Sequence, residues 1–148
     1  MPQSHTRLLY HLVFCTRRRE PLIAEPWASE LYAVFGGIVR DRRGDMLAAG
    51  GVADHVHLLA RLPADLAVSD VVRDIKAVSS GWRHDQGDTG FWWQNGYGAF
   101  TVSASKVDTV SGYIARQPEH HKRQSLRDEY LGLLRRHGID VDENHLWE

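Results

Sequence analysis

The stretch DHVHLL (residues 54–59) carries most of the information about how this chain folds and what it does. Side chains alternate between the two faces of a β-strand, so His55 and His57 are expected on one face, with Cα atoms about 6.6 Å apart. Val56 and Leu58 then point to the other face, toward a hydrophobic core. Two neighbouring imidazoles can bind one divalent metal ion, although His-x-His spacing by itself fits ordinary surface or hydrogen-bonded histidines equally well.

The segments around this strand predict a β-α-β-β-α-β order followed by two more helices. This order is that of a ferredoxin-like (RRM-like) fold in the α+β class, an antiparallel sheet with two helices on one face and additional C-terminal helices. The other face would be free for a partner, a substrate or the third helix. The predicted strands are residues 7–16, 46–53, 55–62 and 99–102, and the predicted helices are 27–38, 68–82, 105–117 and 125–137.

Three local signals refine this outline. The glycine pair at residues 50–51 lies inside a predicted strand, which indicates a bulge or a close approach of another backbone. Ser105 and Asp108 form a capping-box pattern that predicts the start of the third helix, and Ser125 begins a similar pattern for the fourth helix.

Length and composition fit one globular domain spanning residues 1–148. Hydrophobic residues make up 43% and charged residues 25% of the chain, which excludes disordered and fibrous classes. No apolar run approaches the ~20 residues of a membrane span. The single cysteine, Cys15, excludes an intramolecular disulfide and predicts a reducing, cytoplasmic location. The net charge of -1 gives no overall signature of nucleic-acid binding, but local basic clusters such as Arg17–Arg19 can still bind phosphates.

The third predicted helix carries a second group of polar side chains. Tyr113 and Gln117 are four positions apart, so they share one helix face if the helix continues through Gln117. Lys106 falls close to the same direction. A helix on the free face of the sheet would present a phenol, an amide oxygen and an ammonium group toward the two histidines. Read in isolation, the same residues fit a helix surface, and Pro118 disfavours helical geometry at Gln117.

Several segments resemble the single-tyrosine HUH transposases of the insertion sequence 200/605 type. These are DHVHLL (54–59), WQNGYGAF (93–100) and YIARQPEHHK (113–122), and the similarity extends in order over nearly the whole chain. The resemblance implies that His55, His57 and Gln117 bind a divalent metal, Mg²⁺ or Mn²⁺, and that Tyr113 is the nucleophile.

The resemblance also implies an activity and its partners. The protein is expected to cleave and rejoin single-stranded DNA through a 5′-phosphotyrosine intermediate. The expected DNA has a subterminal hairpin, and the expected assembly is a homodimer with active sites shared between subunits. An alternative is a non-catalytic, domesticated single-stranded nucleic-acid-binding protein on the same fold, which would not depend on Tyr113. A metal-storage protein is a third hypothesis.

Other side chains are candidates for DNA contacts because of their chemistry. Trp92 and Tyr97 lie in a glycine-rich segment and can stack on unpaired bases. The remaining candidates are cationic or can become so: Lys106, Arg17, Arg18 and His121.

Overall fold

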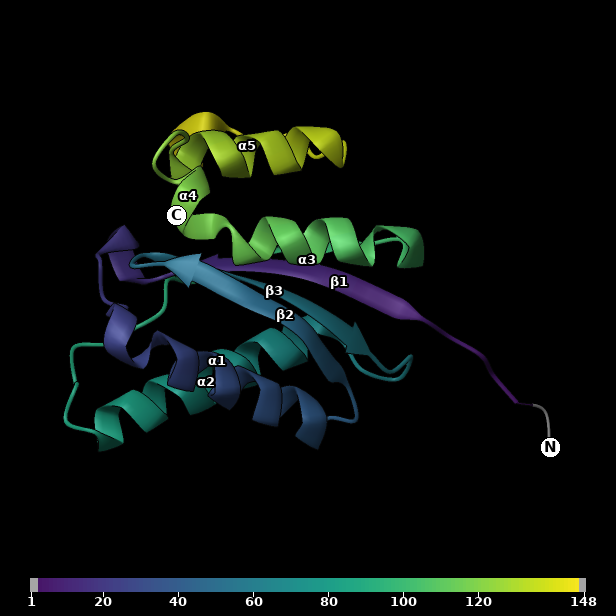
Figure 1. Cartoon of the computed structure of the whole chain (residues 1–148), viewed down its shortest axis with the longest axis horizontal. Helices are drawn as coiled ribbons and strands as arrows, with labels where there is room; N and C mark the ends of the chain where they lie inside the picture. Colours follow the sequence, from purple (N-terminus) through teal and green to yellow (C-terminus); the bar gives the residue numbers. More distant parts are fainter. Residues whose placement is uncertain (1–2, 147–148) are drawn as a thin grey trace.

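The computed structural model describes residues 3–146, apart from the side chain of His145. Four antiparallel strands form one sheet, in the order β2-β3-β1-β4 (Figure 1). The strands are β1 (Leu8–Cys15), β2 (Asp45–Val52), β3 (His55–Leu62) and β4 (Gly98–Thr101). The order along the chain and the antiparallel pairing confirm the predicted ferredoxin-like fold.

Helices cover both faces of the sheet. In Figure 1, α1 and α2 lie against one face, whereas α3, α4 and α5 lie on the other. The helices are α1 (Glu25–Asp41), α2 (Val68–Asp85), α3 (Val107–Ala115), α4 (Gln117–His120) and α5 (Leu126–Arg136), with 3-10 turns at Arg17–Arg19, Ala104–Lys106 and Glu143–His145. Among the helices of residues 3–146, none combines the length and apolar character needed to span a membrane.

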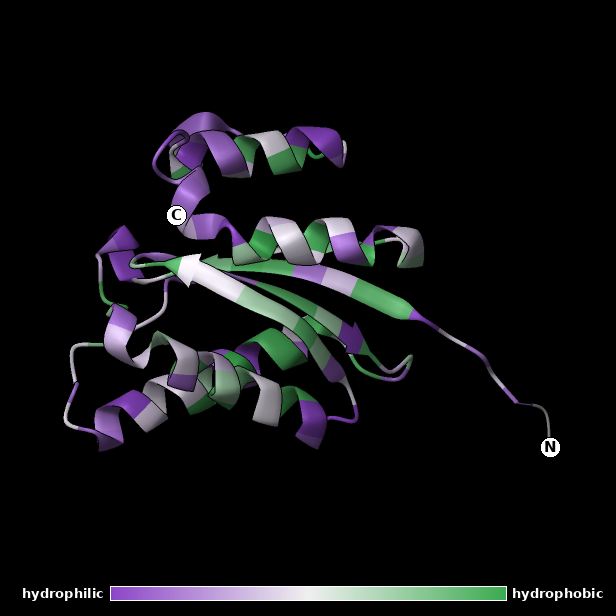
Figure 2. Ribbon diagram, viewed as in Figure 1, coloured by the Kyte–Doolittle hydropathy of each residue, from purple (hydrophilic) through white to green (hydrophobic). Residues whose placement is uncertain are grey.

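The main core lies between the sheet and the α1–α2 layer. Leu12 of β1 and the Val56 and Leu58 side chains of β3 are fully buried there, packed with Phe35 of α1 and Ile75 of α2. Figure 2 shows hydrophobic residues concentrated along the strands, where the two helical layers meet them. Because Val56 and Leu58 face this core, the alternating residues of β3 face the α3–α5 layer, as the sequence predicts.

The opposite face of the sheet is covered in two parts. Helix α3 packs on β2, where a Cβ added to Gly50 would lie 2.4 Å from the Ile114 carbonyl oxygen. Helix α5 packs on the β1–β4 side through a small cluster that includes Val13, Phe100 and Leu133. The close backbone approach predicted at the glycine pair is therefore confirmed. The bulge, the other alternative for that pair, is not formed there, because the register shift of β2 lies between Met46 and Ala48.

Two predictions about helix ends need correction. Helix α3 stops at Ala115 because Arg116 leaves helical geometry (φ -97°, ψ 16°), and α4 begins at Gln117. Pro118 occupies an early position of α4, where its missing N–H costs nothing. The continuous helix expected through Gln117 is therefore wrong.

The predicted cap at Ser105 is also wrong. It lies in the 3-10 turn before α3, and Lys106 precedes that helix without a capping side chain. The cap at Ser125 is confirmed, since its hydroxyl accepts a hydrogen bond of 3.1 Å from the Asp128 backbone N–H at the start of α5.

Candidate active site and metal centre

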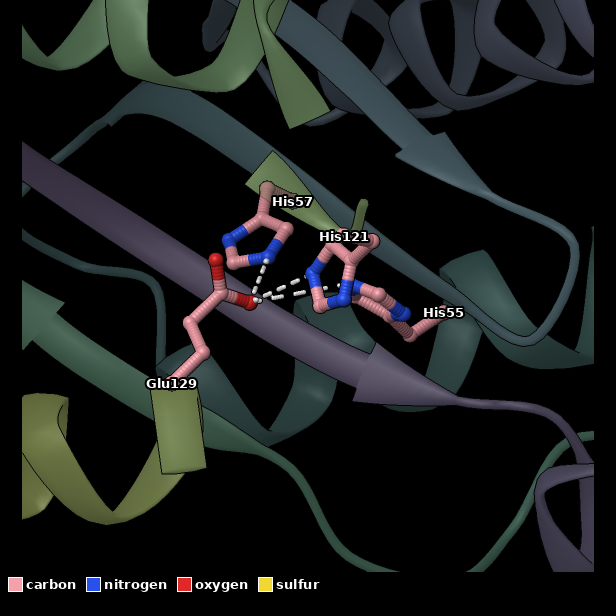
Figure 3. A group of neighbouring side chains, drawn as sticks. All are labelled: His55, His57, His121 and Glu129. Carbon is pink, nitrogen blue, oxygen red and sulfur yellow. Dashed lines mark hydrogen bonds and ion pairs between the residues drawn. The ribbon is translucent and has the colours of Figure 1, made fainter. Parts of the chain in front are cut away.

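Three imidazoles and one carboxylate meet on the face of the sheet covered by α3–α5. Figure 3 shows His55 and His57 from β3, His121 after α4, and Glu129 from α5, with one carboxylate oxygen joined by dashed lines to all three imidazoles. The Glu129 Oε1 atom lies 3.0 Å from His57 Nε2, 3.2 Å from His121 Nε2 and 3.6 Å from His55 Nε2. His55 and His57 are fully buried and Glu129 is 2% exposed, so the cluster is shielded from solvent.

The positions of these side chains follow from their secondary structure. The alternation of β3 places His55 and His57 on the same face, as predicted from the sequence. Glu129 lies on the apolar stripe of α5, three residues after Leu126 and four before Leu133, both of which are buried. Packing of that stripe against the sheet carries the carboxylate into the cluster.

Each strand histidine has a partner that fixes its ring. Asp54, in the turn before β3, lies with Oδ1 2.7 Å from His55 Nδ1. His11 of β1 lies with Nε2 2.8 Å from His57 Nδ1. Burial, together with the nearby His57, lowers the pKa of His11 to about 3, so this ring is neutral and shares a single hydrogen bond with His57. Both contacts leave the Nε2 atoms of the strand histidines directed toward Glu129.

Gln117 and Tyr113 reach the same carboxylate from the α3–α4 segment. The Gln117 side chain is fully buried, with Oε1 3.3 Å from His55 Nε2, and its Nε2 donates a 3.1 Å hydrogen bond to Glu129 Oε2. The Tyr113 hydroxyl donates a hydrogen bond to the same oxygen of Glu129. The phenol and the amide therefore converge with the histidines although they lie in two short helices and not in one.

The charges of the cluster are strongly coupled. Burial opposes ionisation of Glu129, but its contacts with the rings of His121, His55 and His57 hold its pKa well below the usual range. Burial also disfavours the charged form of His55, but the hydrogen bond to Asp54 and the nearby Glu129 carboxylate raise its pKa to about 9. Burial and the hydrogen bond to Glu129 raise the pKa of Tyr113. In this arrangement Glu129 is an anion, and Tyr113 keeps its proton.

The donor atoms fit a divalent metal ion. One ring nitrogen from each of the three histidines and a carboxylate oxygen of Glu129 all lie within 4.8 Å of one another. Neutral imidazole nitrogens and carboxylate oxygens are common ligands of divalent metals. Gln117 Oε1 adds a neutral oxygen beside His55. The cluster can therefore bind one divalent cation, whose identity the donor set leaves open.

Lys106 lines a cavity beside Tyr113, and Tyr97 lines a different cavity that reaches the cluster. Lys106 lines a cavity of about 310 Å³ together with Tyr113. Tyr97 is 40% exposed and lines a cavity of about 210 Å³ that also reaches His55. His121, a candidate for DNA contacts, belongs to the cluster itself, with its ring directed at Glu129.

Arg17, Arg18 and Trp92 lie together beside the loop that follows α2. Arg17 and Trp92 line a shallow hollow of about 300 Å³. The Arg18 backbone N–H donates to the Gln94 side chain in the same loop. Trp92 is 47% exposed, whereas the neighbouring Trp93 is buried in the core. Neither the cluster nor Tyr113 lines this hollow.

Sequence reasoning missed Glu129, and it missed Asp54 and His11 as partners of the two strand histidines. One signal for Glu129 was available: a carboxylate on the apolar stripe of a helix is costly to bury without partners. The pairing of His11 with His57 depends on strand register, in which Val13 and not His11 lies directly opposite His57. That contact could not be read from sequence spacing.

Comparison with known proteins identifies the family. Residues 4–117 match the family described as IS200-like transposases. The transposase for insertion sequence element IS200 of Salmonella typhimurium is 29% identical over 136 residues, which cover 87% of this chain and 85% of that protein. The ISDra2 transposase TnpA of Deinococcus radiodurans is 25% identical over 118 residues, covering 75% of this chain and 84% of the relative.

Solved structures show the same fold. A putative transposase from Deinococcus radiodurans superposes with a TM-score of 0.61 at 23% identity, covering 77% of this chain and 95% of that one. A REP-associated tyrosine transposase bound to a REP hairpin gives a TM-score of 0.62 at 19% identity, covering 82% of this chain and 73% of the other.

The fold and the sequence matches together define the class of protein as a transposase. This chain belongs to the IS200-like transposase family. Membership makes it an enzyme of DNA transposition, a DNA strand transferase and endonuclease.

Proposed function

We propose that this transposase cleaves and rejoins single-stranded DNA through a covalent bond between Tyr113 and the 5′ phosphate of the cut strand. The Tyr113 oxygen forms a bond to phosphorus while the bond from phosphorus to the 3′ oxygen breaks, which releases a 3′-hydroxyl. Rejoining is the same exchange in reverse, with a 3′-hydroxyl attacking and Tyr113 leaving. The covalent intermediate conserves the phosphodiester bond energy, so no nucleotide triphosphate is required.

The residues around Tyr113 support this chemistry. His55, His57 and Gln117 would hold Mg²⁺ or Mn²⁺, with His121 and Glu129 within reach of the same position. Such an ion would withdraw charge from the bound phosphate and orient it. The phenol is half-buried beside a cavity, so it can meet both the cluster and a substrate from outside.

The proposed substrate is single-stranded DNA that carries a subterminal hairpin at the element ends. Support comes from the structural relative, a tyrosine transposase bound to a REP hairpin. The hollow beside Arg17 and Trp92 offers a cation and an exposed aromatic ring, which suit a phosphate and an unpaired base respectively. The Arg18 backbone contacts Gln94 of the same loop, Tyr97 lines the neighbouring cavity, which shares Gln94 and Asn95 with this hollow, and Lys106 lines the cavity beside Tyr113.

The observation that carries the proposal is the convergence of the Tyr113 hydroxyl, Gln117 and three imidazoles on Glu129. The test incubates the protein with Mg²⁺ or Mn²⁺ and single-stranded DNA from the flanks of its own gene. A covalent adduct is expected on a denaturing gel for the wild type and for Tyr32→Phe, a tyrosine of α1 outside the cluster. Tyr113→Phe should give none. An adduct of equal yield with Tyr113→Phe would disprove the assignment, and DNA binding without any adduct would favour a non-catalytic DNA-binding protein.

A homodimer with shared active sites remains a prediction from the resemblance. Tyr113 already contacts Glu129 of its own chain, which favours a site made within one subunit. Mixing Tyr113→Phe with His57→Ala decides between the two arrangements. Each variant lacks one part of the site, so a mixture regains adduct formation only if the tyrosine of one subunit serves the histidines of another. Recovery of the adduct would support the shared site, and an inactive mixture would favour a site made within one subunit.

A further inference from the structure

A cavity of about 310 Å³ opens directly beside Tyr113, between α3, α5 and the end of β4. Val110 and Tyr113 form its α3 side, Leu133 and Arg136 its α5 side, and Phe100 its β4 side. Phe100 and Leu133 are buried and make the floor apolar. Tyr113 therefore has the buried cluster on one side and this cavity on the other.

The rim of the cavity is positively charged. Lys106 and Arg136 line it from two different helical segments, and both are exposed. No carboxylate is among the described residues that line it, and neither cation forms an ion pair within residues 3–146. Arg135, the neighbour of Arg136, points elsewhere and pairs with Glu143 at 2.9 Å. The two rim cations are thus available to an anionic ligand.

The remaining lining suits one nucleotide of a DNA strand. Thr101, Ser103 and Thr109 contribute hydroxyl groups around the rim, next to the apolar floor. An apolar floor accommodates a base or a sugar, whereas the cations and hydroxyls suit a phosphate. Tyr113 lines this cavity while its hydroxyl donates to Glu129 in the cluster, so a strand bound in the cavity would lie beside the residue that attacks it.

The proposed chemistry gives this cavity a strand polarity. When Tyr113 holds the 5′ phosphate, the strand on the 3′ side of the cut stays attached to it, while the strand on the 5′ side is free to leave. Resting on the proposed function, we infer that the cavity binds the first nucleotide on the 3′ side of the cut. Lys106 and Arg136 bind the next phosphate along that strand, and so keep the attached end in place until rejoining.

Binding measurements test whether the cavity takes DNA at all. Fluorescence anisotropy with labelled single-stranded DNA from the flanks of the gene is measured over a range of salt concentrations, in a Tyr113→Phe background that prevents cleavage. Adding Arg136→Ala or Lys106→Ala should weaken binding roughly tenfold and reduce the salt slope by about 0.7 for each lost phosphate contact. Arg135→Ala is the matched control and should change neither quantity. Equal behaviour of Arg136→Ala and Arg135→Ala would overturn the inference.

A second experiment tests the polarity, using the cleavage position mapped from the wild-type adduct. A neutral methylphosphonate replaces the phosphate that follows the first nucleotide on the 3′ side of the cut. This replacement should weaken binding to the Tyr113→Phe protein but have little further effect when Arg136→Ala is added. The same replacement on the 5′ side of the cut should weaken DNA binding equally for the Tyr113→Phe protein and for the protein that also carries Arg136→Ala. If the 3′-side replacement weakens DNA binding equally in both proteins, the assigned polarity is refuted.

The two experiments also separate failure of the inference from failure of the proposed function. The adduct is a bond between Tyr113 and DNA, so it tests the proposed function directly. If the wild type forms no adduct, the proposed function is wrong. If the adduct forms and Arg136 and Lys106 prove irrelevant to binding, only the cavity assignment is wrong. Thermal unfolding of each variant checks that the fold is retained.

Discussion

Replacing Gly50 by alanine tests whether the contact between β2 and α3 positions Tyr113. The new Cβ would lie 2.4 Å from the Ile114 carbonyl oxygen, roughly 1 Å short of the 3.4 Å at which ordinary contact begins. Gly50 is not among the glycines with positive φ, so alanine can adopt its backbone conformation and the penalty is purely steric. Because the obstacle is backbone and not a flexible side chain, α3 itself has to move.

The expected magnitude follows from this clash. Overpacking of this kind costs about 1–3 kcal/mol of stability. Ile114 is the residue after Tyr113, so a shift of about 1 Å displaces the nucleophile as well. Misplacement on that scale can slow an enzymatic step by about 100-fold. Gly50→Ala should therefore lower both the free energy of unfolding and the rate of DNA adduct formation.

The assay is urea unfolding followed by circular dichroism, with adduct formation timed in parallel. Gly81→Ala is the matched control, because a Cβ at this position in the middle of α2 meets nothing within 4 Å. That variant should gain about 0.5–1 kcal/mol, since alanine loses less entropy than glycine on forming a helix. If Gly50→Ala is as stable as Gly81→Ala, the packing argument fails. If it loses stability but keeps the wild-type rate of adduct formation, α3 packing does not position Tyr113.

Three further predictions concern the surroundings of the cluster. Asp54→Asn should lower the affinity for Mn²⁺ about 10–100-fold, because it weakens the hydrogen bond that orients the His55 ring. Titration calorimetry measures this affinity, and the control Asp128→Asn, at an exposed position, should leave the affinity unchanged. Ser125→Ala removes the cap of α5 and should cost about 1 kcal/mol in urea unfolding; no loss would mean that the cap is irrelevant. Burial raises the pKa of the Cys15 thiol to about 11, so iodoacetamide at pH 8 should modify the folded chain far more slowly than the unfolded chain, and equal rates would contradict this.

Much of the sheet could be predicted because its residues obey a simple rule. Alternation along β3 correctly separated His55 and His57 from the core residues Val56 and Leu58. The order of the strands followed from the succession of elements and the known ferredoxin-like arrangement. Local signals were less reliable at helix ends, since Ser105 has the right residue type for a cap but lies in a 3-10 turn.

The site was only partly predictable, because it depends on how distant segments pack. Tyr113 and Gln117 were expected to share a helix face, yet the break at Arg116 separates them into two helices that still converge on the cluster. Glu129 could not be placed from spacing, because it reaches the histidines only through the packing of α5 on the sheet. Its roles toward Tyr113 and a metal ion remain predictions for experiment.

The origin of the Glu129 carboxylate has a practical consequence for anyone preparing fragments of this protein. The family match ends at residue 117, so His121 and Glu129 both come from the segment beyond it. A fragment trimmed at that boundary would keep every strand of the sheet. It would lose Glu129, which is the only carboxylate among the four potential metal ligands found in the described residues. Fragments designed from family boundaries should therefore extend at least through α5. Sequence differences between relatives in this segment would alter the charge around the histidines while leaving the sheet intact.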